Sequence, residues 1–233
     1  MTSRLQRGWG VALAAAVALS GCGVNFYAGR PSDVKRIQEL AGELDRLRQQ
    51  KEAENQQLRD AKSLLEQRLQ QEIADKQAKL EMTERGLVIT FVAEVLFDSG
   101  KATLRPEALD SLRKVAQVIQ QKVSDRDIGV EGHTDNQPIK HSGWKSNWEL
   151  STSRATSVIH FFEHEGLNPH QLSAIGYGEY RPVTSNDMAD GRRKNRRVEI
   201  VILPKKLTKH EADLLRRAPE IDAYKAHAAS DIK

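Results

Sequence analysis

The fold class is set by the stretch Leu87-Val-Ile-Thr-Phe-Val-Ala-Glu-Val-Leu-Phe97, where β-branched and aromatic residues first dominate the chain. This composition predicts a strand or a hairpin. The loop Asp98-Ser-Gly-Lys101 follows, and Pro106 stands where a helix can begin. Apolar residues then recur at the three- and four-residue spacing of a helix. They are Leu109, Leu112, Ala116, Ile119 and Val123.

Further along the chain, strand and helix patterns alternate. A short strand is expected at 127–131, and Ser146 and Glu149 have the spacing of a capping box that opens a second helix. The stretches 172–177 and 198–203 read as two more strands. The order β-α-β-α-β-β predicts an α+β sandwich with helices on one face of a mixed sheet. A domain of this kind over residues 86–204 is long enough for one independent core.

The overall composition indicates that part of the chain is not globular. The 233 residues contain 36 Lys plus Arg and 32 Asp plus Glu, a net charge of +4, with only 39% apolar and 5% aromatic residues. This charge is too small to imply nucleic-acid binding by itself. Cys22 is the single cysteine, which excludes intrachain disulfides and cysteine-built metal sites. Collagen-like, disulfide-rich and multi-span membrane classes are excluded as well.

A helical spacer at 34–85 explains why the apolar fraction of the chain is low. This stretch has no proline, no aromatic residue and a single glycine, and strong helix formers dominate it. A narrow apolar stripe begins at Ile37, resumes at Leu58 and continues through Leu69 and Leu80 with a shifted phase, which predicts a four-residue stutter. A weak oligomeric coiled coil and a lone solvated helix both fit this stripe. Either form would reach roughly 75 Å at 1.5 Å per residue.

The first 21 residues are typical of an export signal. A positive start precedes an apolar run that is far shorter than the ~20 residues of a spanning helix. The run ends in Leu19-Ser-Gly-Cys22, which resembles a bacterial lipobox. Cleavage would leave Cys22 as an acylated N-terminus, labelled by palmitate, followed by a linker at 22–33. Gly23 then implies the outer membrane by the enteric-type sorting rule, whereas the alternative is an ordinary signal peptide with a chance cysteine.

The tail at 205–233 carries scattered apolar residues interrupted by Pro219. It is expected to form one short amphipathic helix and a frayed end, with no function assigned.

Four ordered motifs carry a resemblance to a known family. They are Gly132-His-Thr-Asp-Asn136, Asn147-Trp-Glu-Leu-Ser-Thr-Ser-Arg-Ala155, Gly176-Tyr-Gly-Glu179 and Asn195-Arg-Arg-Val-Glu-Ile200. Together they resemble the OmpA-like C-terminal domain family, which includes OmpA, Pal and MotB and binds peptidoglycan non-covalently. The long loop from Gln137 to Asn147 is similar to the MotB form.

The resemblance implies a ligand, the diaminopimelate residue of the peptidoglycan stem peptide. Its side-chain end bears an ammonium and a carboxylate on one carbon. Asp135 would take the ammonium and Arg154 the carboxylate in a bidentate pair. The alternative is a structural ion pair between these two residues. Other positions matching the family's site are Asp98, Thr134, Asn147, Leu150, Asn195 and Arg196.

Three further features have alternative interpretations. His160-Phe-Phe-Glu-His164 fits an inverted zinc-protease pattern, but both histidines point away from the apolar helix face and no third ligand is identifiable. The basic run 192–197 is better explained by a turn and by solvation than by nucleic acid. Trp144 and Trp148 could stack on sugar rings, and packing of Trp148 against the sheet is the alternative. No metal, cofactor or catalytic residue is expected.

The leading hypothesis is therefore an outer-membrane lipoprotein that tethers the membrane to the cell wall, with its domain facing the periplasm. The main alternative is a MotB-like motility stator or a secretion-machine anchor, with envelope protein partners or self-association through 34–85. A stator would need an inner-membrane helix of ~20 apolar residues with a proton-carrying Asp, and the apolar run is about half that length. A wall-modifying enzyme is the third alternative, and the sequence provides no nucleophile or metal-bound water for it.

Overall fold

Five strands form one sheet in the computed structural model, which describes residues 31–140 and 143–230. They are β1 (Ala78–Thr83), β2 (Gly86–Val92), β3 (Ile128–His133), β4 (Leu172–Gly176) and β5 (Arg197–Ile202). Their order across the sheet is β1-β2-β5-β3-β4. Only β3 and β4 run parallel, and every other neighbouring pair in this sheet is antiparallel. The predicted α+β class with a mixed sheet is confirmed.

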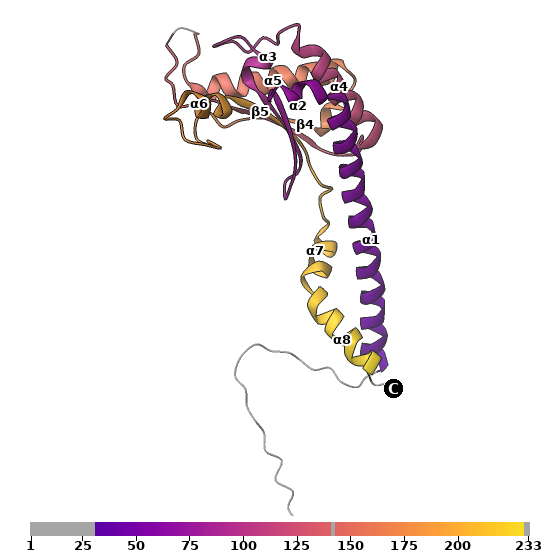
Figure 1. Cartoon of the computed structure of the whole chain (residues 1–233). Helices are drawn as coiled ribbons and strands as arrows, with labels where there is room; N and C mark the ends of the chain where they lie inside the picture. Colours follow the sequence, from indigo (N-terminus) through magenta and orange to yellow (C-terminus); the bar gives the residue numbers. More distant parts are fainter. Residues whose placement is uncertain (1–30, 141–142, 231–233) are drawn as a thin grey trace, which may run out of the picture.

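Helices cover one face of this sheet (Figure 1). They are the short α3 (Ala93–Leu96), α4 (Ala108–Lys122) and α5 (Asn147–His164), while a 3-10 turn at Pro169–Gln171 and α6 (Ala189–Asn195) lie in the connections. Ser146 caps α5 by accepting a hydrogen bond from the backbone N–H of Trp148. The core contains alternate residues of β5, namely Val198, Ile200 and Ile202, all fully buried as predicted. The sheet and α5 meet closely at Gly132, where a Cβ would lie 2.0 Å from the carbonyl oxygen of Ser151.

The expected spacer helix ends earlier than predicted. The first helix, α1, spans Pro31–Arg68, and the short α2 spans Gln70–Ala74. Lys76 then adopts a left-handed conformation (φ 56°), and the N–H groups of Lys76 and Gln77 donate to the carbonyls of Ile73 and Glu72. This is a Schellman stop with lysine in the place usually taken by glycine. The predicted helix and stutter through Leu80 are therefore wrong, because 78–83 form β1 and pair with β2.

The predicted boundary of the domain at residue 86 is also too late. The C-terminal part of α1 packs into the same core as the sheet and α4, so the domain includes residues from Leu58 onward. The stripe residues that enter this core are Leu58, Ala61, Leu65 and Leu69. The run 87–97 divides into β2 and α3, and the basic run begins within α6 rather than in a turn.

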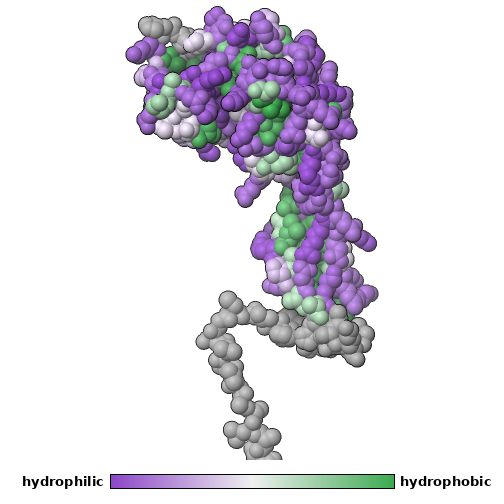
Figure 2. All heavy atoms as spheres, in the orientation of Figure 1, coloured by the Kyte–Doolittle hydropathy of each residue, from purple (hydrophilic) through white to green (hydrophobic). Residues whose placement is uncertain are grey.

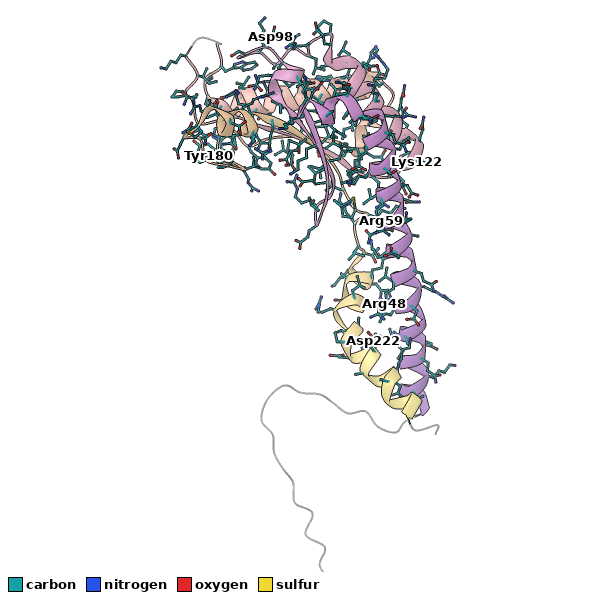
Figure 3. The ribbon with its side chains drawn as sticks, in the orientation of Figure 1. Arg48, Arg59, Asp98, Lys122, Tyr180 and Asp222 are labelled. Atoms are coloured by element: carbon teal, nitrogen blue, oxygen red, sulfur yellow. The ribbon has the colours of Figure 1, made fainter. Side chains whose placement is uncertain are left out.

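The tail forms two helices that lie along the N-terminal part of α1 (Figure 1). They are α7 (Lys209–Arg216), which begins with a capping box at Thr208, and α8 (Ala218–Ser230). Leu44 and Leu47 of α1 pack with Leu214 and Ile221 of the tail in a second, separate apolar cluster. Figure 3 shows Arg48 and Asp222 facing each other across this contact, and their side chains form an ion pair at 2.6 Å.

Together α1, α7 and α8 form an arm that projects from the domain, with apolar surface where the helices meet (Figure 2). The expectation of a lone solvated helix is wrong, because the chain's own tail covers the stripe. At ~1.5 Å per residue, the 38 residues of α1 span roughly 57 Å. No helix within the described residues is long and apolar enough to cross a membrane. The predicted signal segment, Cys22 and residues 22–30 of the linker lie outside the described residues.

Candidate functional site

Asp135 belongs to a row of charged side chains that begins beyond the C-terminal end of β3. It lies just beyond β3, and its Oδ1 accepts a hydrogen bond from the backbone N–H of Gln137 at 3.1 Å. Arg196 donates from Nη1 to Oδ2 of Asp135 and from Nε to Oε1 of Glu94, both at 2.6 Å. Burial lowers the pKa of Arg196, but the hydrogen bonds to Asp135 and Glu94 outweigh it and raise that pKa above its ordinary value. Arg196 thus bridges two carboxylates.

Arg154 lies beside this row and is held differently. It projects from α5, is only 4% exposed, and donates from Nε to the carbonyl of Lys101 at 2.9 Å and from Nη2 to the carbonyl of Asp98 at 3.4 Å. Its guanidinium lies 5.2 Å from the ring centroid of Phe97, a cation–π contact. Within the described part of the chain, no carboxylate forms an ion pair with Arg154 and its Nη1 donates no hydrogen bond.

Burial lowers the pKa of Arg154 to about 10, while the carboxylates of Glu94 and Asp135 oppose that shift and Arg196 adds to it. Asp135 and Arg154 therefore lie in one electrostatic cluster. The alternative of a structural ion pair between them is wrong, because Asp135 pairs with Arg196 instead. A guanidinium fixed by backbone carbonyls and free of a carboxylate partner among the described residues is suited to binding an anionic group.

Three more of the predicted residues, Thr134, Asn147 and Leu150, lie directly after β3 or at the start of α5. Asn147, at the start of α5, donates from Nδ2 to Glu179 Oε2 at 2.7 Å and to the carbonyl of Gln137 at 3.2 Å. Thr134 donates its backbone N–H to the carbonyl of Gly178 at 2.9 Å. The hydroxyl oxygen of Thr134 is buried and has no hydrogen-bond partner within the described residues. Leu150 is buried in the same part of α5.

The remaining two predicted residues are placed less directly. The Asp98 side chain is half-exposed and pairs with Lys101 at 3.1 Å, so its backbone carbonyl is what contacts Arg154. Asn195 is fully buried, accepts from the N–H groups of Val183 and Thr184, and donates to the loop that follows them. Its amide therefore fixes the loop before α6, and no hydrogen bond within the described residues joins it to Asp135 or Arg154.

Glu94 belongs to the cluster although no sequence motif predicts it there. Glu94 is the only charged residue in the apolar run 87–97, and this is the signal that could have identified it. The composition of the run 87–97 predicts a strand or a hairpin, but residues 93–96 form α3 in the structure, which brings the Glu94 carboxylate to Arg196. With Glu94 and Asp135 against Arg154 and Arg196, the cluster has two charges of each sign.

A second buried polar group lies on the sheet face opposite the helices. Glu131, His133 and Glu199 bring their ligand-type atoms within 4.8 Å of one another. However, Arg85 pairs with both glutamates, at 2.7 Å and 3.2 Å, and Arg197 pairs with Glu199 at 2.7 Å. Burial and, after it, the nearby charge of Arg197 lower the pKa of His133 to about 3. The two arginines already neutralise the two carboxylates, so the donor set fits a metal ion poorly.

The zinc-protease-like motif at 160–164 and the basic run at 192–197 have structural explanations. His160 and His164 are exposed on α5, and His160 lies 3.6 Å from Glu163. The basic run is not a continuous patch, because Arg192 binds backbone carbonyls and both Arg196 and Arg197 are paired with carboxylates.

Comparison with known proteins identifies the family. Residues 96–196 match the model of the OmpA family, which confirms the resemblance found in the motifs. Motility protein B of Bacillus subtilis is 42% identical over 156 residues, an alignment that covers 66% of this chain and 59% of that relative. The chain therefore spans about three fifths of that relative's length.

Solved structures show the same fold. A putative MotB like protein from Desulfovibrio vulgaris superposes with a TM-score of 0.61 at 26% identity, covering 68% of this chain and 99% of that one. The cell wall anchor of the T6SS from Pseudomonas aeruginosa gives a TM-score of 0.56 at 30% identity, covering 60% of this chain and 97% of that one.

Proposed function

Residues 96–196 form an OmpA family domain, and we propose that this domain anchors the chain to the cell wall by binding peptidoglycan non-covalently, without enzymatic activity. The observation that carries the proposal is that Arg154 is buried without a paired carboxylate among the described residues. Its guanidinium is buried against two backbone carbonyls and Phe97, and no carboxylate pairs with it among the described residues. Burying a charge without a counter-ion is costly, so a ligand carboxylate at this position would recover part of that cost.

The ligand that fits this cluster is the diaminopimelate end of the stem peptide. Arg154 takes its carboxylate, and Asp135 takes its ammonium. Asp135 already accepts from Arg196 and from a backbone N–H, but an ionised carboxylate has about four acceptor positions, so its two oxygens can accept further donors. The role of Arg196 in this arrangement is to hold the Asp135 carboxylate in place.

Membrane attachment is the second part of the proposal. Acylation of Cys22 would hold the chain at the outer membrane, and the arm of α1, α7 and α8 would separate the domain from the lipid. The arm is a better spacer than a lone helix, because its apolar stripe is covered by the tail. A two-layer contact with ion pairs such as that between Arg48 and Asp222 also resists bending.

A second candidate function is a motility-type or secretion-machine anchoring subunit. The observation that favours it is the 42% identity to Motility protein B together with the likeness to the cell wall anchor of the T6SS. Both candidates use the same domain in the same way, and they differ in the membrane and the partner. Palmitate labelling combined with envelope fractionation separates them. The lipoprotein proposal expects labelling that Cys22→Ala abolishes, and labelling that survives this change would contradict it.

Binding of purified sacculi tests the wall-anchoring proposal. Arg154→Ala should weaken co-sedimentation with sacculi by roughly 2–5 kcal/mol, because it removes one partner of a buried charge pair with the ligand. Arg193→Ala is the matched control, since Arg193 carries the same charge on the exposed side of α6. Asp135→Asn keeps the shape of the side chain and should also weaken binding. Unchanged binding of both site variants would refute the proposed site.

A further inference from the structure

Glu94 is a charged member of the Arg154 cluster to which the proposed ligand contacts assign no role. Its place is fixed by the backbone, because its carbonyl accepts from Arg105 Nη1 at 3.1 Å and the N–H of Ala93 donates to the carbonyl of Arg196 at 2.9 Å. The Oε1 of Glu94 accepts from Nε of Arg196 at 2.6 Å and also forms an ion pair with Nη2 of that arginine. The other oxygen, Oε2, is buried and has no hydrogen-bond partner within the described residues. The cluster therefore holds a fixed carboxylate with one oxygen that no donor satisfies.

Glu94 is also the carboxylate that acts most strongly on Arg154. Burial is the largest influence on the pKa of Arg154 and lowers it. Among the charges, Glu94 comes first and raises that pKa, ahead of the opposing effect of Arg196 and the supporting effect of Asp135. A carboxylate whose charge acts on the guanidinium in this way also repels an anion that binds to the same guanidinium. Glu94 is thus in a position to weaken the binding of simple anions at Arg154.

The cluster as a whole carries no net charge. It combines two guanidinium groups and two carboxylates, those of Arg154, Arg196, Asp135 and Glu94. The neighbouring Asp98 does not change this balance, because its side chain pairs with Lys101 at 3.1 Å. Asp98 lies on the side of the domain away from the arm (Figure 3). A neutral cluster with charges of both signs is complementary to a ligand that also has one charge of each sign.

We propose that Glu94 is a specificity-determining residue, whose charge makes the cluster prefer a zwitterionic end group to a simple carboxylate. This inference rests on the proposed function, because it concerns the same binding site. Without the charge of Glu94 the cluster would carry a net charge of +1, which favours any anion that reaches Arg154. With that charge, a carboxylate that lacks a neighbouring ammonium is repelled, whereas the ammonium of a zwitterion is attracted. Glu94 would thereby exclude ordinary carboxylates, such as a peptide C-terminus, from Arg154.

The test is a calorimetric titration of the full chain with three stem peptides that differ at one residue. The first contains diaminopimelate, the second contains lysine, which keeps only the ammonium, and the third contains 2-aminopimelate, which keeps only the carboxylate. Glu94→Gln keeps the shape of the side chain and removes its charge. It should strengthen binding of the aminopimelate peptide and weaken binding of the lysine peptide, each by about five-fold, as one unit of charge near a binding site does. The ratio of these two affinities should therefore change by about 25-fold in Glu94→Gln.

This ratio reports charge rather than folding, because a partly unfolded variant would lose affinity for all three peptides in proportion. Glu94→Asp keeps the charge and should leave the ratio close to that of the wild type. Glu163→Gln is the matched control, since it removes the same charge from an exposed position nine residues beyond Arg154 on α5, roughly 13 Å along the helix. In this control the ratio should stay within about two-fold of the wild-type value.

The outcomes separate this inference from the wall-anchoring proposal. An unchanged ratio in Glu94→Gln, in a protein whose wild type binds the diaminopimelate peptide, would overturn the inference and leave the anchoring proposal standing. Equal shifts of the ratio in Glu94→Asp and Glu94→Gln would overturn it as well, because side-chain length rather than charge would then be the cause. A wild type that binds neither sacculi nor any of the three peptides would refute the anchoring proposal and this inference with it.

Discussion

His133 should make the stability of the domain depend on pH. Its side chain is 2% exposed, and both ring nitrogens lack hydrogen-bond partners within the described residues. The ring stacks on Tyr177 at a centroid distance of 5.2 Å. Burial lowers its pKa from 6.5 to about 3, and the nearby charge of Arg197 acts in the same direction. Glu199 opposes the shift, but burial and the arginines outweigh it.

The sign of the effect follows from the direction of the pKa shift. Because the pKa of His133 is lower in the folded state, the unfolded chain binds the proton first as the pH falls below 6.5. The contribution of neutral His133 to the free energy of unfolding is therefore fully present above pH 6.5 and is lost progressively as the pH falls toward 3. At 1.36 kcal/mol per pKa unit, the shift predicts a loss of about 2 kcal/mol between pH 7.5 and pH 5.

Urea unfolding at several pH values, in wild type and His133→Phe, measures this contribution. Phenylalanine keeps the stacking on Tyr177 and removes the titration. Glu131, Glu199 and the neighbouring arginines are present in both proteins, so the difference in pH dependence isolates His133. The variant should lose about 2 kcal/mol less than the wild type between pH 7.5 and pH 5. Equal pH dependence in the two proteins, or an imidazole resonance of His133 that titrates near pH 6.5 in the folded protein, would refute the reasoning.

Two further predictions concern packing. Ile221→Ala should release the tail from α1 at a cost of about 2–5 kcal/mol to the arm, seen as faster hydrogen exchange in α8 with the domain unaffected; unchanged exchange would contradict the packing of the tail on α1. Gly132→Ala should disrupt the domain, because its Cβ would lie 2.0 Å from the carbonyl oxygen of Ser151. Gly129→Ala, on the same strand but with its nearest contact at 3.6 Å, should be tolerated, and equal melting temperatures for the two variants would contradict the close approach of sheet and helix.

The elements that could be predicted from the sequence are those whose own pattern determines them. Val198, Ile200 and Ile202 alternate as side chains on one face of a strand do, and Ser146 stands as a helix cap does. The strand β1 could not be recognised in this way. Its residues continue a helical spacing, and the signal that ends the helix is a left-handed Lys76, a role that glycine usually takes. Pairing with β2 overrides the local helix preference of these residues.

The residues of the site could be predicted from the sequence, but the pairing between their charged groups could not. Asp135, Arg154 and Arg196 were all expected at the site, and the structure brings them into one cluster. Which carboxylate each guanidinium takes depends on the turn of the run 87–97 into α3, which delivers Glu94. That turn rests on tertiary contacts rather than on the composition of the run. The packing of the tail on the apolar residues of α1 is also a tertiary contact. The sequence does not predict it, because the two segments are far apart along the chain.

Calorimetric titration of the full chain with two stem peptides tests whether Arg154 receives the carboxylate at the side-chain end of diaminopimelate. One peptide contains diaminopimelate and the other contains lysine, which has the same ammonium but lacks that carboxylate. We expect the wild type to bind the diaminopimelate peptide at least about ten-fold more tightly than the lysine peptide, and Arg154→Ala to remove this preference. Equal affinity of the wild type for the two peptides, or an undiminished preference in Arg154→Ala, would contradict it.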